Sequence, residues 1–86
     1  MKLFHATTHR KLKRYCDTGC ILPPVRGWTT KAAAIAWARQ TFRPIVLELE
    51  LSTVYPLPDH KRTDGRAFWS TDQPTTARIV STRANA

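Results

Sequence analysis

Residues 44–51, PIVLELEL, decide the fold, because apolar residues occupy every second position of this stretch. A period of two is typical of a strand whose two faces meet different surroundings. Its two faces are Ile45, Leu47, Leu49 and Leu51 against Val46, Glu48 and Glu50. We therefore expect one face in the core and the other partly solvated, with the alternating glutamates on the wet side and not forming a pair of catalytic carboxylates.

A strand and a basic helix are predicted upstream of this stretch. Lys2–Ala6 predicts a short strand, and Thr8 is a suitable N-cap for a helix with apolar residues on one side and Lys and Arg on the other. Gly19 suits the C-cap of this helix. Two consecutive prolines prevent its continuation, so we predict a loop over Ile21–Pro24.

A second strand and a second helix follow this loop. Val25–Trp28 predicts a short strand, and either Thr29 or Thr30 caps a helix over Lys31–Gln40. The run AAAIAWAR within this helix has a very high helix propensity and is apolar on two sides. We therefore expect the central buried helix here, with its alanines in close contact with a sheet.

The last third of the chain has a less regular pattern. Ser52–Asp64 contains two prolines and ends at a DG turn signal, so we predict an ordered loop with at most a short strand at its start. Arg66–Ser70 and Ala77–Thr82 predict the last strands, and Arg83–Ala86 a frayed tail. The order of elements predicts one domain over 1–86 of the α+β class, a small mixed sheet with two helices.

The charge of the chain is unevenly distributed. Its 86 residues include 14 Lys and Arg and 6 Asp and Glu, for a net charge of +8. Residues 1–43 hold nine of the basic residues and one acid, whereas residues 44–86 hold five of each. Such an excess favours a polyanionic partner, a nucleotide or nucleic acid, although it also serves solubility alone. The densest basic cluster consists of Arg10, Lys11, Lys13 and Arg14.

Segments that target a chain to a membrane or to secretion are not apparent. No apolar run approaches the roughly 20 residues of a membrane span, so we expect a cytoplasmic protein without a membrane partner. Cys16 and Cys20 could bind zinc only together with histidines, and their spacing is not that of a common zinc motif. We therefore expect two buried, reduced thiols and no bound metal.

The first candidate site is a histidine within the first strand. His5 could form a hydrogen bond with a ribose or phosphate oxygen, and Thr7 and Thr8 add hydroxyl groups next to a helix N-terminus, which favours anions. The alternative is a half-buried structural histidine beside an ordinary N-cap.

The second candidate site combines a histidine, an arginine and a tryptophan from the last third. Arg66 follows a turn glycine and could bind a phosphate through two hydrogen bonds, while Trp69 could stack on a base. Asp59 could orient His60. Alternatively, Phe68 and Trp69 straddle the sheet, and one of them fills the core.

Three segments resemble the first half of the ADP-ribosyltransferase fold: LFHATT at 3–8, KLKRYCDTGCI at 11–21 and RGWTTKAAAIAWA at 26–38. In that family a strand with a histidine followed by Thr or Ser is succeeded by a helix that ends at a glycine. A Gly-aromatic-Thr strand and an alanine-rich helix come next. The resemblance implies NAD as the cofactor, with its ribose and nicotinamide bound by His5, Thr7 and Trp28.

The chain departs from this family in its second half. Transferases of this group usually carry a glutamate near the start of a late strand, but no glutamate follows Glu50. The RNA 2′-phosphotransferase branch instead relies on arginine and histidine. The resemblance to this branch implies roles for Arg26, His60 and Arg66.

The main hypothesis is a small basic ADP-ribosyltransferase-like domain that binds NAD, ADP-ribose or a nucleotide phosphate, with or without catalysis. Its catalytic residues would be His5, His60 and Arg66, and its ligand-binding residues Thr7, Arg26, Trp28 and Trp69. One alternative is a non-enzymatic nucleic-acid-binding module that uses exposed tryptophans together with Arg10, Lys11, Lys13 and Arg14. Another is a small inhibitor or accessory protein, of the kind phages encode, that covers an acidic protein surface.

Overall fold

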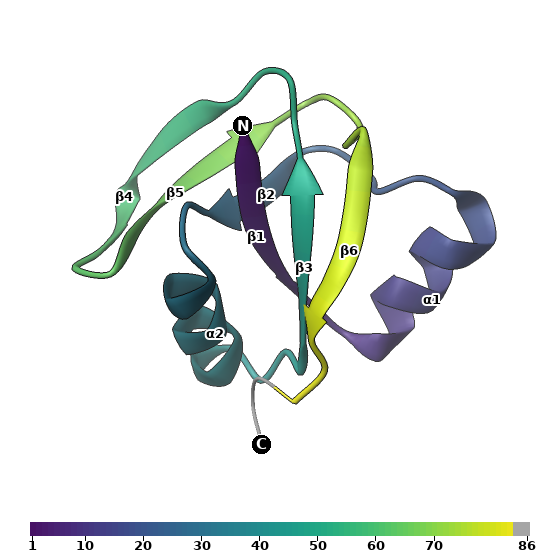
Figure 1. Cartoon of the computed structure of the whole chain (residues 1–86), viewed down its shortest axis with the longest axis horizontal. Helices are drawn as coiled ribbons and strands as arrows, with labels where there is room; N and C mark the ends of the chain where they lie inside the picture. Colours follow the sequence, from purple (N-terminus) through teal and green to yellow (C-terminus); the bar gives the residue numbers. More distant parts are fainter. Residues whose placement is uncertain (84–86) are drawn as a thin grey trace.

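Six strands form one sheet with two helices, which confirms the α+β class (Figure 1). The computed structural model describes residues 1–83, apart from the side chain of Lys61. The predicted frayed tail, beyond Arg83, lies outside the described residues. The elements are β1 (Lys2–Thr7), α1 (His9–Thr18), β2 (Val25–Trp28), α2 (Lys31–Gln40), β3 (Ile45–Glu50), β4 (Tyr55–Arg62), β5 (Gly65–Ser70) and β6 (Thr76–Ser81).

The strand order is β4-β5-β2-β1-β3-β6, so the first strand of the chain lies in the middle of the sheet. Each hydrogen-bonded pair is antiparallel, whereas we expected a mixed sheet. The physical reason is the place of β1. α2 connects β2 to β3, which run parallel to each other, but β1 lies between them and pairs antiparallel with both.

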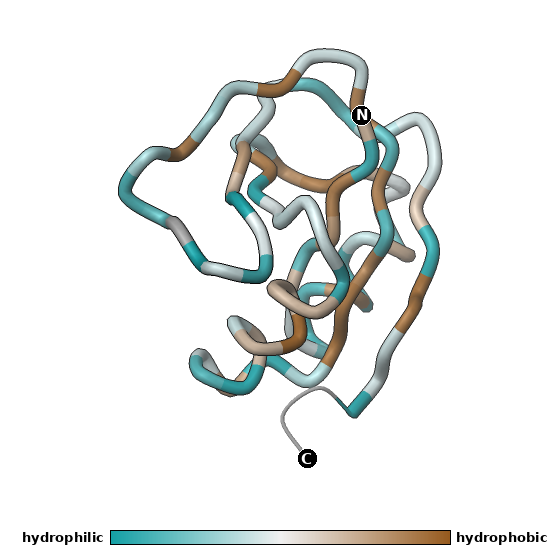
Figure 2. Tube along the Cα trace, turned by 60° about the vertical axis from the view of Figure 1, so that its left-hand side comes forward, coloured by the Kyte–Doolittle hydropathy of each residue, from teal (hydrophilic) through white to brown (hydrophobic). Residues whose placement is uncertain are grey.

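The alternation in β3 creates two separate hydrophobic clusters, one on each face of the sheet. Val46 packs with Ala6, Trp28 and Ala67 on the face that α2 covers. The opposite face carries the second cluster, which includes Leu3, Val25, Ile45, Leu47, Leu49 and Leu51. Figure 2 shows the hydrophobic residues gathered in the central strands and hydrophilic residues at the tip of the β4–β5 hairpin.

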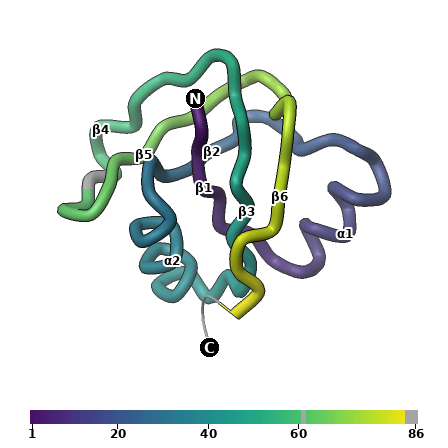
Figure 3. The backbone as a smooth tube through the Cα atoms, viewed as in Figure 1, coloured from purple at the N-terminus to yellow at the C-terminus, as the bar shows by residue number. Residues whose placement is uncertain are grey.

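Helix α1 begins and ends where the sequence predicted, but it packs loosely. Thr8 Oγ1 accepts a hydrogen bond from the Lys11 N–H, and Gly19 adopts a left-handed conformation with φ of 71°. No residue of α1 is fully buried, and the helix stands to one side of the sheet (Figure 3). As a result, Cys16 and Cys20 are free but exposed, and the prediction of buried thiols was wrong.

Helix α2 packs closely on one face of the sheet. Ala33, Ala34 and Ala38 are fully buried, which confirms the close contact predicted for the alanines. The helix is nevertheless not a central buried one, because its other side, including Lys31, is exposed to solvent. Among residues 1–83, no helix is both long and apolar enough to cross a membrane.

The N-terminus of α2 is hydrogen-bonded to the β4–β5 hairpin. Thr30 is the N-cap; its Oγ1 accepts a hydrogen bond from the Ala33 N–H and donates one to the Asp64 carbonyl at 2.6 Å. A Cβ atom at Gly65 would lie only 2.8 Å from the Cβ of Ala33, so this contact requires glycine. The hairpin and α2 therefore hold a fixed position relative to each other.

The prediction of a loop over residues 52–64 was wrong, because Tyr55–Arg62 forms β4. Pro56 and Pro58 are tolerated here because β4 is an edge strand, which has a neighbouring strand on one side only. A proline without an N–H can therefore occur in β4 without removing a hydrogen bond between strands. The Asp64-Gly65 turn signal lies at the hairpin turn that joins β4 to β5. Arg62 and Gly65 are register partners at the two ends of this turn.

Gly27 sets the spacing of the two central strands. A Cβ atom there would lie 2.8 Å from the Leu3 Cβ and 3.1 Å from the Phe4 carbonyl oxygen. We therefore expect Gly27→Ala to lower the free energy of unfolding by about 1–3 kcal/mol, as overpacking typically does. Urea denaturation measures this loss.

Gly19→Ala is the control for this substitution. It introduces strain at a positive φ but meets no atom within 4 Å. Hydrogen exchange of the Trp28 amide should be accelerated more by Gly27→Ala than by Gly19→Ala, because only the former pushes β1 and β2 apart. A Gly27→Ala protein as stable as the wild type would contradict the steric argument.

Candidate functional site

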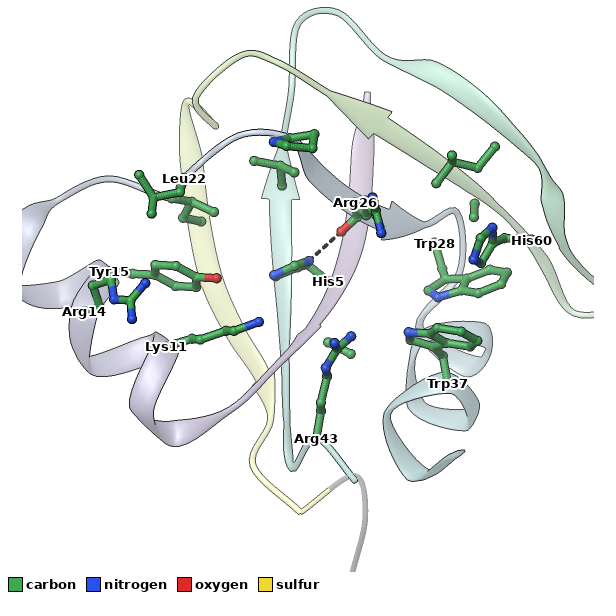
Figure 4. Close-up of a pocket in the computed structure, with 17 residues that line it drawn as sticks. His5, Lys11, Arg14, Tyr15, Leu22, Arg26, Trp28, Trp37, Arg43 and His60 are labelled. Atoms are coloured by element: carbon green, nitrogen blue, oxygen red, sulfur yellow. Dashed lines mark hydrogen bonds between the residues drawn. The ribbon is translucent and has the colours of Figure 1, made fainter. Parts of the chain in front are cut away.

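A pocket of about 430 Å³ opens between the two central strands. β1 and β2 are in register at Phe4 and Trp28. Residues of both strands line the pocket (Figure 4). They are His5 and Ala6 from β1, and Val25–Trp28 from β2. Successive residues of a strand point to opposite faces of a sheet. The pocket therefore receives side chains from the α1 side as well as from the α2 side.

His5 bridges the gap between the two strands. Its Nδ1 lies 2.5 Å from the Arg26 carbonyl oxygen. A carbonyl only accepts hydrogen bonds, so Nδ1 carries the hydrogen and Nε2 of a neutral ring is an acceptor. This Nε2 is buried and has no hydrogen-bond partner among the described residues. In Figure 4 it lies on the side of the ring that faces Tyr15.

The surroundings of His5 keep its imidazole neutral. Burial lowers the pKa of His5 below the ordinary 6.5, and the positive charges of Arg43 and Lys11 lower it further. The hydrogen bond to the Arg26 carbonyl acts in the opposite direction and is outweighed. At neutral pH the pocket therefore presents an oriented hydrogen-bond acceptor at Nε2.

Four basic side chains line the pocket, and the described lining residues include no Asp or Glu. Lys11 and Arg43 point toward the centre of the pocket, where His5 lies (Figure 4). Arg43 follows a turn at Phe42, which has a φ of 57°, and its N–H donates to the Ala38 carbonyl at 2.8 Å. The basic residues are Lys11 and Arg14 from α1, Arg26 from β2, and Arg43. Such a lining attracts an anionic ligand.

An aromatic group forms the other side of the pocket. The ring centroids of Trp28 and Trp37 are 5.8 Å apart, and those of Trp37 and His60 are 5.7 Å apart in an edge-on arrangement. His60 reaches this position because the β4–β5 register is irregular between Pro56 and Lys61, as in a bulge that redirects side chains. His60 Nδ1 is buried and lacks a hydrogen-bond partner among the described residues.

The structure brings six of the predicted site residues together and leaves five outside. Those that line the pocket are His5, Lys11, Arg14, Arg26, Trp28 and His60. Thr7 is fully buried, and its Oγ1 has no hydrogen-bond partner among the described residues. The other four outside the pocket are Arg10 and Lys13, exposed on α1, Arg66, whose N–H donates to Thr29 Oγ1, and Trp69, which contacts Tyr55.

Among the charged and aromatic residues that line the pocket, three were missed by the sequence analysis. Tyr15 lies one turn from Lys11 and beside Arg14, so helical spacing could have assigned it to the same face. Trp37 was expected only as part of an apolar helix. Arg43 enters the pocket through the turn after α2, and no local pattern in the sequence indicates this.

Within residues 1–83, leaving the side chain of Lys61 aside, no group of three or more His, Cys, Asp or Glu residues is placed to hold a metal ion.

Comparisons of the chain with protein-family models, curated proteins and solved structures gave no match.

The neutral state of His5 makes stability depend on pH. The unfolded chain takes up a proton at His5 near pH 6.5, whereas the folded protein resists this protonation, so the contribution of His5 to stability is fully present above pH 6.5 and is lost as the pH falls below it. We expect His5→Asn to flatten this decrease, since an amide can still donate to the Arg26 carbonyl. Urea unfolding at about pH 7.5 and about pH 5.5 measures the difference.

His9→Asn is the matched control, because His9 is exposed on α1. This variant should keep the wild-type decrease in stability between the two pH values. The same decrease in the wild type and in His5→Asn would contradict the burial argument.

Proposed function

We propose that the chain is a small basic ADP-ribosyltransferase-like domain whose pocket binds NAD, ADP-ribose or another nucleotide through its phosphate and ring. The observation that carries this proposal is the composition of the pocket. Basic side chains and an oriented histidine line one side, and an aromatic group lines the other. A nucleotide has the same division between a charged phosphate and a flat ring.

Each part of a nucleotide has a chemically suitable partner. The phosphate would lie near Lys11 and Arg43, since charge-assisted hydrogen bonds are stronger than neutral ones. A ribose hydroxyl would donate to His5 Nε2, the acceptor left without a partner. The ring would lie against the aromatic group, where His60 Nδ1 offers a further polar contact.

The family resemblance adds support from two residues. His5 and Trp28, to which it assigns the ribose and the nicotinamide, line the same pocket. Thr7, Arg66 and Trp69 do not line it. The described lining contains no glutamate that could stabilise a ribosyl cation, so we propose ligand binding and not transfer. We expect binding to take place in the cytoplasm.

Titration with NAD and ADP-ribose, followed by tryptophan fluorescence, tests the proposal, because Trp28 and Trp37 line the pocket. We expect quenching by at least one of the two ligands. Arg43→Ala should weaken binding by about tenfold or more, the usual effect of losing a hydrogen bond to a charged group.

Lys13→Ala is the matched control, because it removes one positive charge from α1 outside the pocket. It should change the affinity less than twofold. An equal loss in both variants would indicate general attraction by the net charge and not a specific pocket. Absence of binding by either ligand would contradict the proposal.

A further inference from the structure

A row of side chains crosses the sheet from the rim of the pocket to the edge strand β4. Arg26 on β2 is the register partner of Trp69 on β5, and Trp69 is the register partner of Tyr55 on β4. Residues directly opposite each other on antiparallel strands project to the same face and contact each other. Because Arg26 also lines the pocket, the row begins where the pocket opens.

Trp69 and Tyr55 form an aromatic surface, which we call the Trp69 platform. Their ring centroids are 4.9 Å apart, and their planes are inclined by 36°. Tyr55 is 44% exposed, and Trp69 is half-buried. The platform is therefore accessible to solvent along the edge of the sheet.

The platform has no evident role in the core. Neither ring belongs to the two hydrophobic clusters of the described residues, although Phe68, the neighbour of Trp69, packs against one of them. Exposed aromatic rings on a sheet, next to basic side chains, are the usual means by which proteins stack the bases of unpaired nucleic acid.

We propose that the Trp69 platform stacks the base adjacent to a nucleotide held in the pocket, so that the ligand of this protein is a single-stranded nucleic acid. This inference rests on the proposed function, because it needs a nucleotide in the pocket. Arg26 lies between the two positions and would neutralise the phosphate that joins the two nucleotides.

The charge and the geometry favour a single strand over other occupants. A net charge of +8, concentrated in the half of the chain that supplies Arg26, complements a polyphosphate backbone. In a duplex the faces of the bases are stacked on each other, so only an unpaired strand can offer a base to the platform. Adjacent strands are about 4.8 Å apart, so Trp69 lies one strand spacing from Arg26.

Binding of AMP and of a tetraadenylate, compared by fluorescence at low salt, tests this inference. Wild-type protein should bind the tetranucleotide at least about fivefold more tightly than AMP, the low end of the effect of one stacked base. Tyr55→Ala should abolish most of this preference and leave AMP binding within twofold of the wild type. Raising the salt from roughly 50 to 200 mM should weaken the tetranucleotide more than AMP.

Two further variants separate stacking from folding. Trp69→Phe keeps an aromatic ring and should retain most of the preference for the tetranucleotide, whereas Trp69→Ala should lose it. Ile79→Ala is the matched control, because Ile79 is an exposed hydrophobic residue, 48% accessible, on β6 at the opposite edge of the sheet and outside the pocket. It should bind both ligands as the wild type does.

The outcomes distinguish this inference from the function on which it rests. If AMP and the tetranucleotide bind equally to the wild type, or if Tyr55→Ala weakens both ligands alike, the platform does not stack a second base and the inference is overturned. If Tyr55→Ala weakens NAD but not the tetranucleotide, the platform serves a free dinucleotide, which also overturns it. In these cases the proposed nucleotide pocket is still supported if the wild type binds AMP and His5→Asn weakens that binding. If the wild type binds none of AMP, NAD and ADP-ribose, both the proposed function and this inference are overturned.

Discussion

The hydrogen bond from His5 Nδ1 to the Arg26 carbonyl is the interaction on which the site depends. It joins the two central strands at the place where the pocket opens between them. A carbonyl in such a gap needs a donor, because an unsatisfied polar group away from water costs free energy. The imidazole supplies this donor, and the same bond determines which ring nitrogen remains an acceptor. This one hydrogen bond therefore supplies the Arg26 carbonyl with a donor and leaves Nε2 of His5 as an acceptor.

The two helices contribute different chemistry because they lie on different sides of the central gap. α1 supplies Lys11 and Arg14, whereas α2 supplies Trp37. The insertion of β1 between β2 and β3 makes this possible, since residues on both of its faces, His5 and Ala6, reach the pocket. A site with one charged side and one aromatic side thus follows from the topology of the sheet.

Local patterns in the sequence predicted the elements whose cause is local. The alternation of β3, the caps Thr8 and Gly19, and the buried alanines of α2 depend on neighbouring residues, and all were predicted. β4 was missed because Pro56 and Pro58 resemble loop residues, and only the sheet order shows that they lie on an edge.

The same distinction holds for the site. His5 and His60 were predicted from their residue type and local setting, and Trp28 from the family resemblance alone, but their meeting in one pocket depends on how the strands pair. Arg43 reaches the pocket through a turn of positive φ at Phe42, and Trp69 is separated from the pocket by the width of one strand. Neither relation is encoded in any short segment, so neither could be read from the sequence.

The central position of β1 also governs how the chain acquires its structure. The partners of β1 are residues 25–28 and 45–50, and β2 needs residues 65–70 on its other side. The ends of long loops must therefore meet before the sheet gains its stabilising contacts, which slows folding in proteins of this kind. During synthesis, the first strand cannot pair until residues 25–28 and 45–50 have left the ribosome, and its apolar residues remain exposed to chaperones until then.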